Sequence, residues 1–309
     1  MTDAPSDRSV RGMLKLGVAG LRDANVPSYT LAAELLLLHV VGGDRTWIYA
    51  HPEENLSESQ VQDYLRLIAR REAGEPTQHL TGIQEFWGLQ FRVSREVLIP
   101  RPETEHLIEV ALDRLAVREI QAGRPLKLSG DNVTLIDVGT GSGCIAIALA
   151  KELPGATVYA TDISPAALAV ARQNAARLGF EDRVHFVESN LFAAFSPAAP
   201  RHWPRSFDLV VSNPPYVGRR NSRSLAVEVR EYEPAVALYG GEEGHEFYSA
   251  LLSQATEHLK PTGLLVLELG YDSLPAVRPL LESRYWRDVG ITNDLAGIPR
   301  VLSATRSAQ

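Results

Sequence analysis

The stretch LIDVGTGSGC, residues 135–144, decides how the rest of this chain is interpreted. Its apolar first half predicts a short buried strand, and its three glycines let the backbone turn and approach a ligand before a helix begins. The spacing differs from the dinucleotide fingerprint, in which the third glycine comes one residue later. Because a glycine turn alone is as often structural as ligand-binding, the stretch predicts strand, turn and helix and leaves the ligand open.

The same rhythm of strand, turn and helix continues after residue 130. Such alternation predicts an α/β fold, in which helices flank a mostly parallel sheet and ligands bind at the carboxyl ends of the strands. The predicted strands are residues 133–138, 157–161, 184–187, 207–211 and 264–268, and the predicted helices are residues 142–153 and 165–178.

The second predicted strand of this series ends in an acid, Asp162. It follows the glycine loop by about twenty residues, where a carboxylate can accept hydrogen bonds from both hydroxyls of a ribose. The alternative is that Asp162 caps the helix that begins at Pro165. Together with the glycine loop, Asp162 favours a nucleoside cofactor without saying which one. Asn190, after the third strand, is a candidate contact for the base, although a residue at such a place is more often part of a turn.

The fourth strand stops at Asn213-Pro214-Pro215-Tyr216. Two consecutive prolines stiffen the backbone and keep the preceding residue out of the helical region, so the motif holds an extended shape. This suits a planar NH₂ group: the Asn213 side-chain oxygen and the Pro214 carbonyl can accept its two N–H groups, and the Tyr216 ring can pack on its face. The alternative is a rigid turn with Tyr216 in the core, which loses weight beside a glycine loop and a ribose acid.

The first quarter of the chain has a different texture. Apolar residues recur at helical spacing in residues 13–21, 31–38 and 61–68, and Ser57 precedes the last run as a helix cap. Between Thr81 and Ile99 partly alternating apolar residues and two glycines predict a short hairpin that links two domains.

Composition limits the classes of protein to be considered. The 309 residues carry a formal net charge of −7, which disfavours nucleic acid as the main partner. The single cysteine, Cys144, excludes an intrachain disulfide and fits a reducing compartment. No secretory signal and no apolar run long enough to cross a bilayer is present, so we expect a cytoplasmic protein with no membrane partner.

The motifs resemble those of the HemK/PrmC family, the release factor glutamine methyltransferases. The likeness begins near residue 10 and covers nearly the whole chain. Asn-Pro-Pro-Tyr is shared with several nitrogen methyltransferases, whereas its combination with Ile99-Pro100-Arg101-Pro102-Glu103-Thr104-Glu105 is much more specific. Further matching pieces are Gly74-Glu75-Pro76, Glu85-Phe86-Trp87, Glu233-Pro234, Gly240-Gly241 and Asp294-Leu295-Ala296-Gly297.

The resemblance implies a fold and a division into domains. Residues 1–78 would form a small N-terminal helical bundle that recognises the substrate, and residues 79–100 a linking β-hairpin. Residues 101–309 would form a Rossmann-like, seven-stranded class I methyltransferase domain. The implied cofactor is S-adenosylmethionine, and the implied partner is a peptide chain release factor whose Gly-Gly-Gln glutamine receives the methyl group. We expect a monomer and no direct nucleic-acid substrate.

Carried over by position, the resemblance also assigns site residues. Asn213, Pro214, Pro215 and Tyr216 would hold the glutamine, with Asn213, Pro214 and Tyr216 as the catalytic group. Arg219, Arg220 and Arg223 are candidates for gripping the release factor, with a solvated loop as the alternative. At positions 190 and 191 the family often has an acid and an aromatic residue beside the adenine, where this chain has Asn190 and Leu191. The implied cofactor contacts are Gly139, Thr140, Gly141, Ser142, Gly143, Asp162, Asn190, Leu191 and Asn213.

The electronics of an amide acceptor define the expected mechanism. Its nitrogen is a poor nucleophile because the lone pair is delocalised into the carbonyl. Hydrogen bonds accepted from both N–H groups raise the electron density on nitrogen and aim it at the methyl group, so positioning and electrostatics supply most of the rate. We therefore assign no catalytic histidine, expect no metal site because the histidines lack ligand spacing, and give Cys144 a packing role.

Three other functions stay open at this point. A methyltransferase acting on the exocyclic amine of adenine or guanine could use the same motif, but would favour a basic groove or an added RNA-binding module. A non-catalytic S-adenosylmethionine-binding protein associated with translation would not need an intact Asn213–Tyr216 motif. A Rossmann oxidoreductase would bind NAD in preference to S-adenosylmethionine.

Overall fold

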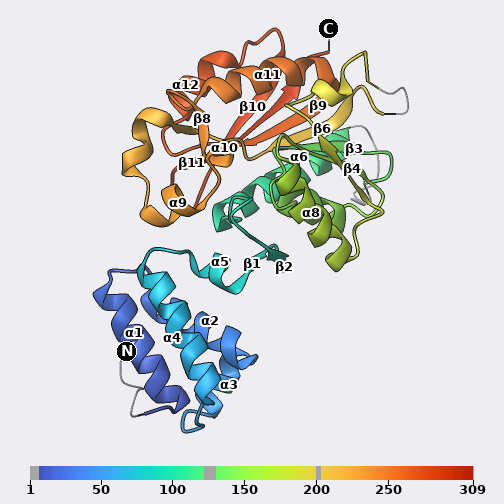
Figure 1. Cartoon of the computed structure of the whole chain (residues 1–309). Helices are drawn as coiled ribbons and strands as arrows, with labels where there is room; N and C mark the ends of the chain where they lie inside the picture. Colours follow the sequence, from blue (N-terminus) through green and yellow to red (C-terminus); the bar gives the residue numbers. More distant parts are fainter. Residues whose placement is uncertain (1–6, 122–129, 200–202, 309) are drawn as a thin grey trace. The chain divides into compact units, whose positions relative to one another are not determined.

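The computed structural model describes residues 7–121, 130–199 and 203–308, and these form two compact units (Figure 1). The first unit runs to Ile83 and also includes Ala226–Tyr232. The second contains Gln84–Leu225 and Glu233 onward. Each unit has a hydrophobic core of its own, so each is described by itself.

The first unit is helical. The Ser57 hydroxyl accepts a hydrogen bond from Gln60 N at 3.2 Å, and the Gln60 side chain accepts one from Ser57 N at 2.9 Å, which confirms the predicted helix start. The amphipathic faces of the long helices bury Met13, Leu36 and Tyr64 in a common core. The helices are α1 (Val10–Asp23), α2 (Tyr29–Val41), α3 (Arg45–Ala50), α4 (Glu58–Glu72), α5 (Thr77–Thr81) and α9 (Val227–Tyr232).

Helix α9 joins this unit although it lies far along the sequence. The buried guanidinium of Arg71 donates to Glu228 Oε2 at 2.5 Å, and the Tyr232 hydroxyl donates to the carbonyl of Ala73 at 3.4 Å. The chain therefore passes from one unit to the other at three places: after Ile83, after Leu225 and after Tyr232.

The second unit is built on a seven-stranded sheet in the order β10-β11-β9-β6-β3-β4-β5 (Figure 1). Strand β3 pairs in parallel with β4 on one side and β6 on the other, and only the pairs made by β11 are antiparallel. This confirms the predicted Rossmann-like α/β class. The strands are β3 (Thr134–Val138), β4 (Thr157–Asp162), β5 (Val184–Glu188), β6 (Phe207–Ser212), β9 (Leu259–Glu268), β10 (Trp286–Asn293) and β11 (Pro299–Arg306).

Helices cover both faces of this sheet. Successive strand residues point to opposite faces, so that Leu135 packs in one core cluster and Ile136 in the other. One cluster includes side chains of α6 (Glu105–Gln121), α7 (Cys144–Glu152) and α8 (Pro165–Leu178). The other includes side chains of α11 (Glu246–His258) and α12 (Leu274–Val277). Burial on both faces explains why the central strands are continuous apolar runs.

The predicted hairpin is present as β1 (Ile83–Phe86) and β2 (Leu89–Arg92). Its two turn residues, Trp87 and Gly88, have φ values of 54° and 66°, as a tight two-residue hairpin turn requires. Phe86 and Phe91 from the two strands pack into the core of the second unit, and Trp87 N donates to Glu105 Oε1 at 2.6 Å.

The pattern-based expectations differ from the structure at the sheet's antiparallel end. Strands β10 and β11 were not among the predicted segments, and β9 begins five residues before the predicted start at Leu264. A short parallel pair, β7 (Val217–Gly218) and β8 (Tyr239–Gly241), was also not foreseen. The remaining elements are η1 (Pro102–Thr104), η2 (Ala193–Phe195), η3 (Arg219–Ser224), α10 (Ala235–Leu238) and η4 (Arg278–Leu280).

None of the helices within the described ranges is long and apolar enough to cross a bilayer.

The pair between Arg71 and Glu228 gives a first prediction. In Arg71→Met the apolar stem is kept but the charged donors are lost, so the free energy of opening α9 should fall by about 1–3 kcal/mol. Hydrogen exchange of the amides of residues 227–232 measures this opening. Arg66→Met is the matched control, because Arg66 and Asp63 form an exposed pair whose loss should change little. Equal exchange of α9 in both variants would contradict the prediction.

Candidate active site

The glycine loop is fixed to the neighbouring strand by its backbone. The amides of Gly139 and Thr140 both donate to the carbonyl of Thr161 at 2.8 Å, and Gly141 N donates to Asp162 Oδ2 at 2.9 Å. Gly139 and Gly141 have φ values of 77° and 54°, and a Cβ added at either would meet no atom within 4 Å. The loop thus offers a bare backbone face to a ligand.

Asp162 ends β4 and is held in place by two amides. Its Oδ1 accepts from Ser164 N and its Oδ2 from Gly141 N, both at 2.9 Å. Burial raises the pKa of this carboxyl, while the hydrogen bonds from these amides oppose the rise. The alternative reading, that Asp162 caps the following helix, is wrong: Ser164 caps α8 and accepts from Ala167 N at 3.2 Å. The amide of Ile163 also interacts with this carboxylate, which keeps acceptor capacity for a ligand.

The Asn213–Tyr216 motif leaves β6 directly after Ser212, whose hydroxyl donates to the Val138 carbonyl at 2.6 Å. Two glycines, Gly240 and Gly270, lie so close to the motif that a Cβ at either would clash with it. A Cβ on Gly240 would collide with the Pro215 carbonyl oxygen, and one on Gly270 would lie 2.7 Å from the Tyr216 ring. Close packing on the strand end thus holds the motif rigid, as the two prolines predict.

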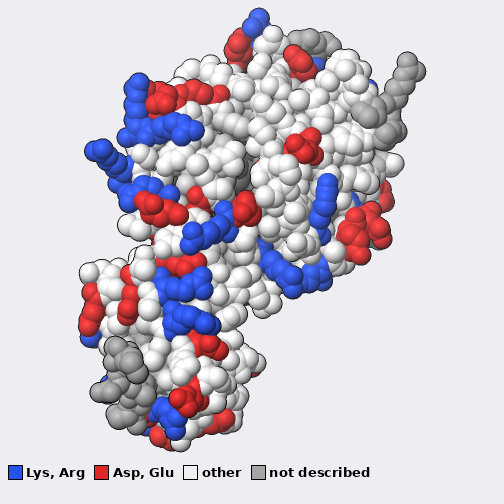
Figure 2. Space-filling view, in the orientation of Figure 1, with Lys and Arg blue, Asp and Glu red and all other residues white. Residues whose placement is uncertain are grey.

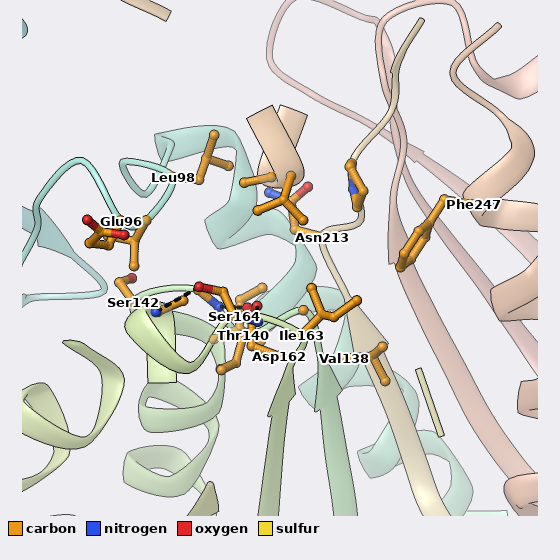
Figure 3. A pocket seen from close by; sticks show the side chains of 18 of the residues that line it. Glu96, Leu98, Val138, Thr140, Ser142, Asp162, Ile163, Ser164, Asn213 and Phe247 are labelled. Carbon is orange, nitrogen blue, oxygen red and sulfur yellow. Dashed lines mark hydrogen bonds between the residues drawn. The ribbon is translucent and has the colours of Figure 1, made fainter. Parts of the chain in front are cut away.

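These elements border one cavity of about 460 Å³ (Figure 3). Figure 3 shows Thr140, Asp162 and Ile163 near one another, with Asn213 further along the cavity and Phe247 beyond it. Most of the predicted site residues line it: Gly139, Thr140, Gly141, Ser142, Asp162, Asn190, Leu191, Asn213 and Pro215. Three of the predicted residues, Gly143, Pro214 and Tyr216, are not among its lining residues. Gly143 packs on Ala171, and Pro214 and Tyr216 are chain neighbours of the lining residues Asn213 and Pro215.

Thr104 and Glu268 also belong to this site, although their roles are not evident from the sequence. Asn213 Nδ2 donates to Thr104 Oγ1 at 3.1 Å, and Thr104 Oγ1 donates to Glu268 Oε2 at 2.6 Å. Burial raises the pKa of Glu268 to about 7. Thr104 lies within the specific motif at residues 99–105, which marks its region, but nothing local connects it to Glu268.

Apolar side chains complete the cavity. Ile163 and Val236 are 52% and 53% exposed, and Phe247 also lines the cavity. Apolar walls with a few convergent polar groups are typical of a small-molecule site. Ile163 directly follows Asp162, so its position next to the acid is a signal that sequence analysis could have used.

Cys144 begins α7 at the edge of the cavity and is buried. Burial raises the pKa of its thiol to about 12, so the group stays protonated at neutral pH and is a poor nucleophile. A packing role accounts for this residue.

Comparison with known families places these observations in context. Residues 13–82 match the PrmC N-terminal domain, and residues 129–282 match a methyltransferase domain family. The hMettl16 catalytic domain superposes with a TM-score of 0.51 over 77% of this chain and 81% of that domain, at 20% identity, which shows the fold alone. The sheet order, the glycine loop and the matched domain define this chain as a Rossmann-like methyltransferase.

Curated relatives specify the family. The release factor glutamine methyltransferase of Koribacter versatilis is 45% identical, over 91% of this chain and 93% of that protein. The protein of the same name from Chlorobaculum tepidum is 40% identical, over 96% of each chain. The chain therefore belongs to the release factor glutamine methyltransferase family, which confirms the resemblance drawn from its motifs.

The close approach at Gly270 gives a second prediction. In Gly270→Ala the new Cβ would lie 2.6 Å from Ser273 Oγ and 2.7 Å from the Tyr216 ring, so both must shift. We expect the free energy of unfolding to fall by about 1–3 kcal/mol, measured by denaturant unfolding. Gly20→Ala in α1 is the control: there the Cβ comes too close only to the flexible end of Glu72 and meets Ile68 at an ordinary contact distance of 3.7 Å. Helix propensity should make this change neutral or stabilising. An unchanged unfolding midpoint in Gly270→Ala would show that this packing is not tight.

Proposed function

We propose that this chain transfers a methyl group from S-adenosylmethionine to the side-chain amide nitrogen of the glutamine in the Gly-Gly-Gln motif of a peptide chain release factor. The observation that carries the proposal is Asn213 Oδ1, a buried oxygen without a hydrogen-bond partner among the described residues. Its side chain lines the same cavity as Asp162 and the glycine loop. The names of the relatives support a glutamine of a release factor as the acceptor.

The residues present fit S-adenosylmethionine. The bare faces of Gly139 and Gly141 allow a close approach of the ligand, and the remaining acceptor capacity of Asp162 can serve two ribose hydroxyls. Ile163 and Leu191, which both line the cavity, offer apolar surface for a planar base. When bound, S-adenosylmethionine supplies the electrophilic methyl group.

The acceptor motif then orients the glutamine. Asn213 Oδ1 accepts one N–H of the substrate amide and the Pro214 carbonyl accepts the other, while the Tyr216 ring, packed against Gly270, supports the segment. Two acceptors on one rigid segment fix the direction of the nitrogen lone pair and raise its electron density. The N–H becomes strongly acidic once the methyl group has arrived, and its proton then passes to solvent water, so hydrogen-bond acceptors matter more than a strong base.

Arg219 is the basic residue best placed to meet the protein substrate. It lines the cavity, and its guanidinium lies 5.1 Å from the centre of the Tyr239 ring. Arg220 pairs instead with Glu243. We therefore assign the contact with the release factor at the cavity to Arg219, and keep Arg223 as a second candidate. The helical unit is assigned as the other contact surface for the release factor.

The alternative methyl acceptor is the exocyclic amine of a nucleic-acid base. Figure 2 shows Lys and Arg side chains next to Asp and Glu over the face in view. Exposed ion pairs such as Arg11 with Glu53 and Arg66 with Asp63 reflect this mixing. With a net charge of −7, this surface favours a protein over a polyanion.

Asp162 gives a test of cofactor binding. Asp162→Asn keeps the shape but loses the charged acceptor, so the Kd for S-adenosylmethionine should rise about 10- to 100-fold in calorimetry. Glu188→Gln is the matched control, because Glu188 is the register partner of Asp162 on β5 and does not line the cavity. Equal affinity of Asp162→Asn and the wild type would contradict the assignment.

Asn213 tests the reaction itself. Incubation with methyl-labelled S-adenosylmethionine and a purified release factor, followed by peptide mass mapping, should place the label on the Gly-Gly-Gln glutamine. Asn213→Ala should lower the rate by about 10²- to 10³-fold with its fold retained, whereas the exposed control Asn293→Ala should not. Label in RNA or DNA instead would overturn the substrate. No label in release factor, RNA or DNA would favour the non-catalytic alternative, and a wild-type methylation rate in Asn213→Ala would contradict the role given to Asn213.

A further inference from the structure

Asn213 is held by a relay of two hydrogen bonds that begins in the cavity wall, where Asn213 and Thr104 both line the cavity. Its Nδ2 donates to Thr104 Oγ1 at 3.1 Å, and Thr104 Oγ1 donates to Glu268 Oε2 at 2.6 Å. Thr104 and Glu268 are 2% and 1% exposed, so water does not compete for these bonds. The three groups come from η1, from the end of β6 and from the end of β9.

The relay has a direction that follows from the number of hydrogens. A threonine hydroxyl has one hydrogen to donate, and an ionised carboxylate can only accept. While Glu268 is ionised, the Thr104 hydroxyl donates its hydrogen to the Glu268 carboxylate. The Thr104 oxygen can then only accept a hydrogen bond from the Asn213 amide. The donor must be the NH₂ end of Asn213, which leaves Oδ1 as the end without a partner among the described residues.

We propose that Thr104 and Glu268 are positioning residues that fix the orientation of the Asn213 amide, so that its oxygen rather than its nitrogen is presented to the substrate. The inference rests on the proposed function, because only a methylated group that donates N–H hydrogen bonds requires an oxygen at this position. With the amide reversed, the NH₂ group of Asn213 would face the NH₂ group of the glutamine. The glutamine would then lose Asn213 Oδ1 as a hydrogen-bond acceptor and keep only the Pro214 carbonyl.

Protonation of Glu268 weakens the relay. A neutral carboxyl can donate to Thr104 Oγ1, which frees the Thr104 hydrogen for Asn213 Oδ1 and favours the reversed amide. Since the pKa of Glu268 is raised to about 7, kcat should fall as the pH drops through 7 and recover as it rises. The groups that act on Glu268 from the surrounding elements are Thr104, Glu103, Arg101, Cys144, Tyr216, Tyr248 and Arg300.

The test compares Thr104→Val, which removes the hydroxyl at constant shape, with Thr104→Ser, which keeps it. Thr104→Val should lower kcat about tenfold or more with little change in the Kd for S-adenosylmethionine, and Thr104→Ser should retain most of kcat. The double variant Thr104→Val/Asn213→Ala should be no slower than Asn213→Ala alone, because both changes remove one function. Glu268→Gln, which cannot ionise, should lose the Glu268 part of the pH dependence near 7, whereas Asp137, whose pKa burial also raises to about 7, still titrates. This variant serves if Thr104→Val does not fold.

Three results would overturn the relay: wild-type kcat in Thr104→Val, a rate in Thr104→Ser as low as in Thr104→Val, or an unchanged pH profile in Glu268→Gln. A readout without any methyl acceptor separates the relay from the proposed function. The side-chain ¹⁵N–¹H₂ resonances of Asn213, assigned by their loss in Asn213→Ala, should shift with a midpoint near pH 7 in the wild type and not in Glu268→Gln. If they do not titrate, the relay is wrong, whichever substrate the enzyme methylates.

Discussion

The parallel pairing of β3 with β4 on one side and β6 on the other is the constraint on which the rest of the structure depends. Parallel strands end at a common edge of the sheet, and the chain order reverses at β3, which opens a crevice there. The glycine loop follows β3, Asp162 is the last residue of β4, and Asn213 follows β6. Segments far apart in the sequence therefore meet around one cavity, with the backbone rather than long side chains setting their positions.

Buried polar groups at that edge make the site specific. Asn213 forms one connected network with Thr104 and Glu268, both of which are buried, and hydrogen bonds to buried groups are strong and hold the amide in place. Close packing of Gly240 and Gly270 on the same segment removes its freedom to move away. Rigidity of this kind suits a reaction whose rate depends on the direction of a nitrogen lone pair.

Much of the second unit could be predicted because its signals are local. Buried parallel strands are continuous apolar runs, as in residues 134–138, and the cofactor and acceptor motifs are contiguous. Strand β10 escaped prediction since it is an edge strand with Arg287, Asp288 and Gly290 in its middle and mostly exposed side chains. Helix α9 has only six residues, and its place depends on Arg71, far away in the sequence.

The sequence by itself determined the α/β class, the glycine loop, the acid at Asp162 and the rigid Asn213–Tyr216 segment, because each depends on short-range sterics and hydrophobic periodicity. Only the tertiary structure decided that Thr104 lies between Asn213 and Glu268, and that residues 226–232 pack with the helical unit. These contacts join residues more than a hundred positions apart, and no local pattern encodes which buried donor meets which acceptor once the strands have aligned.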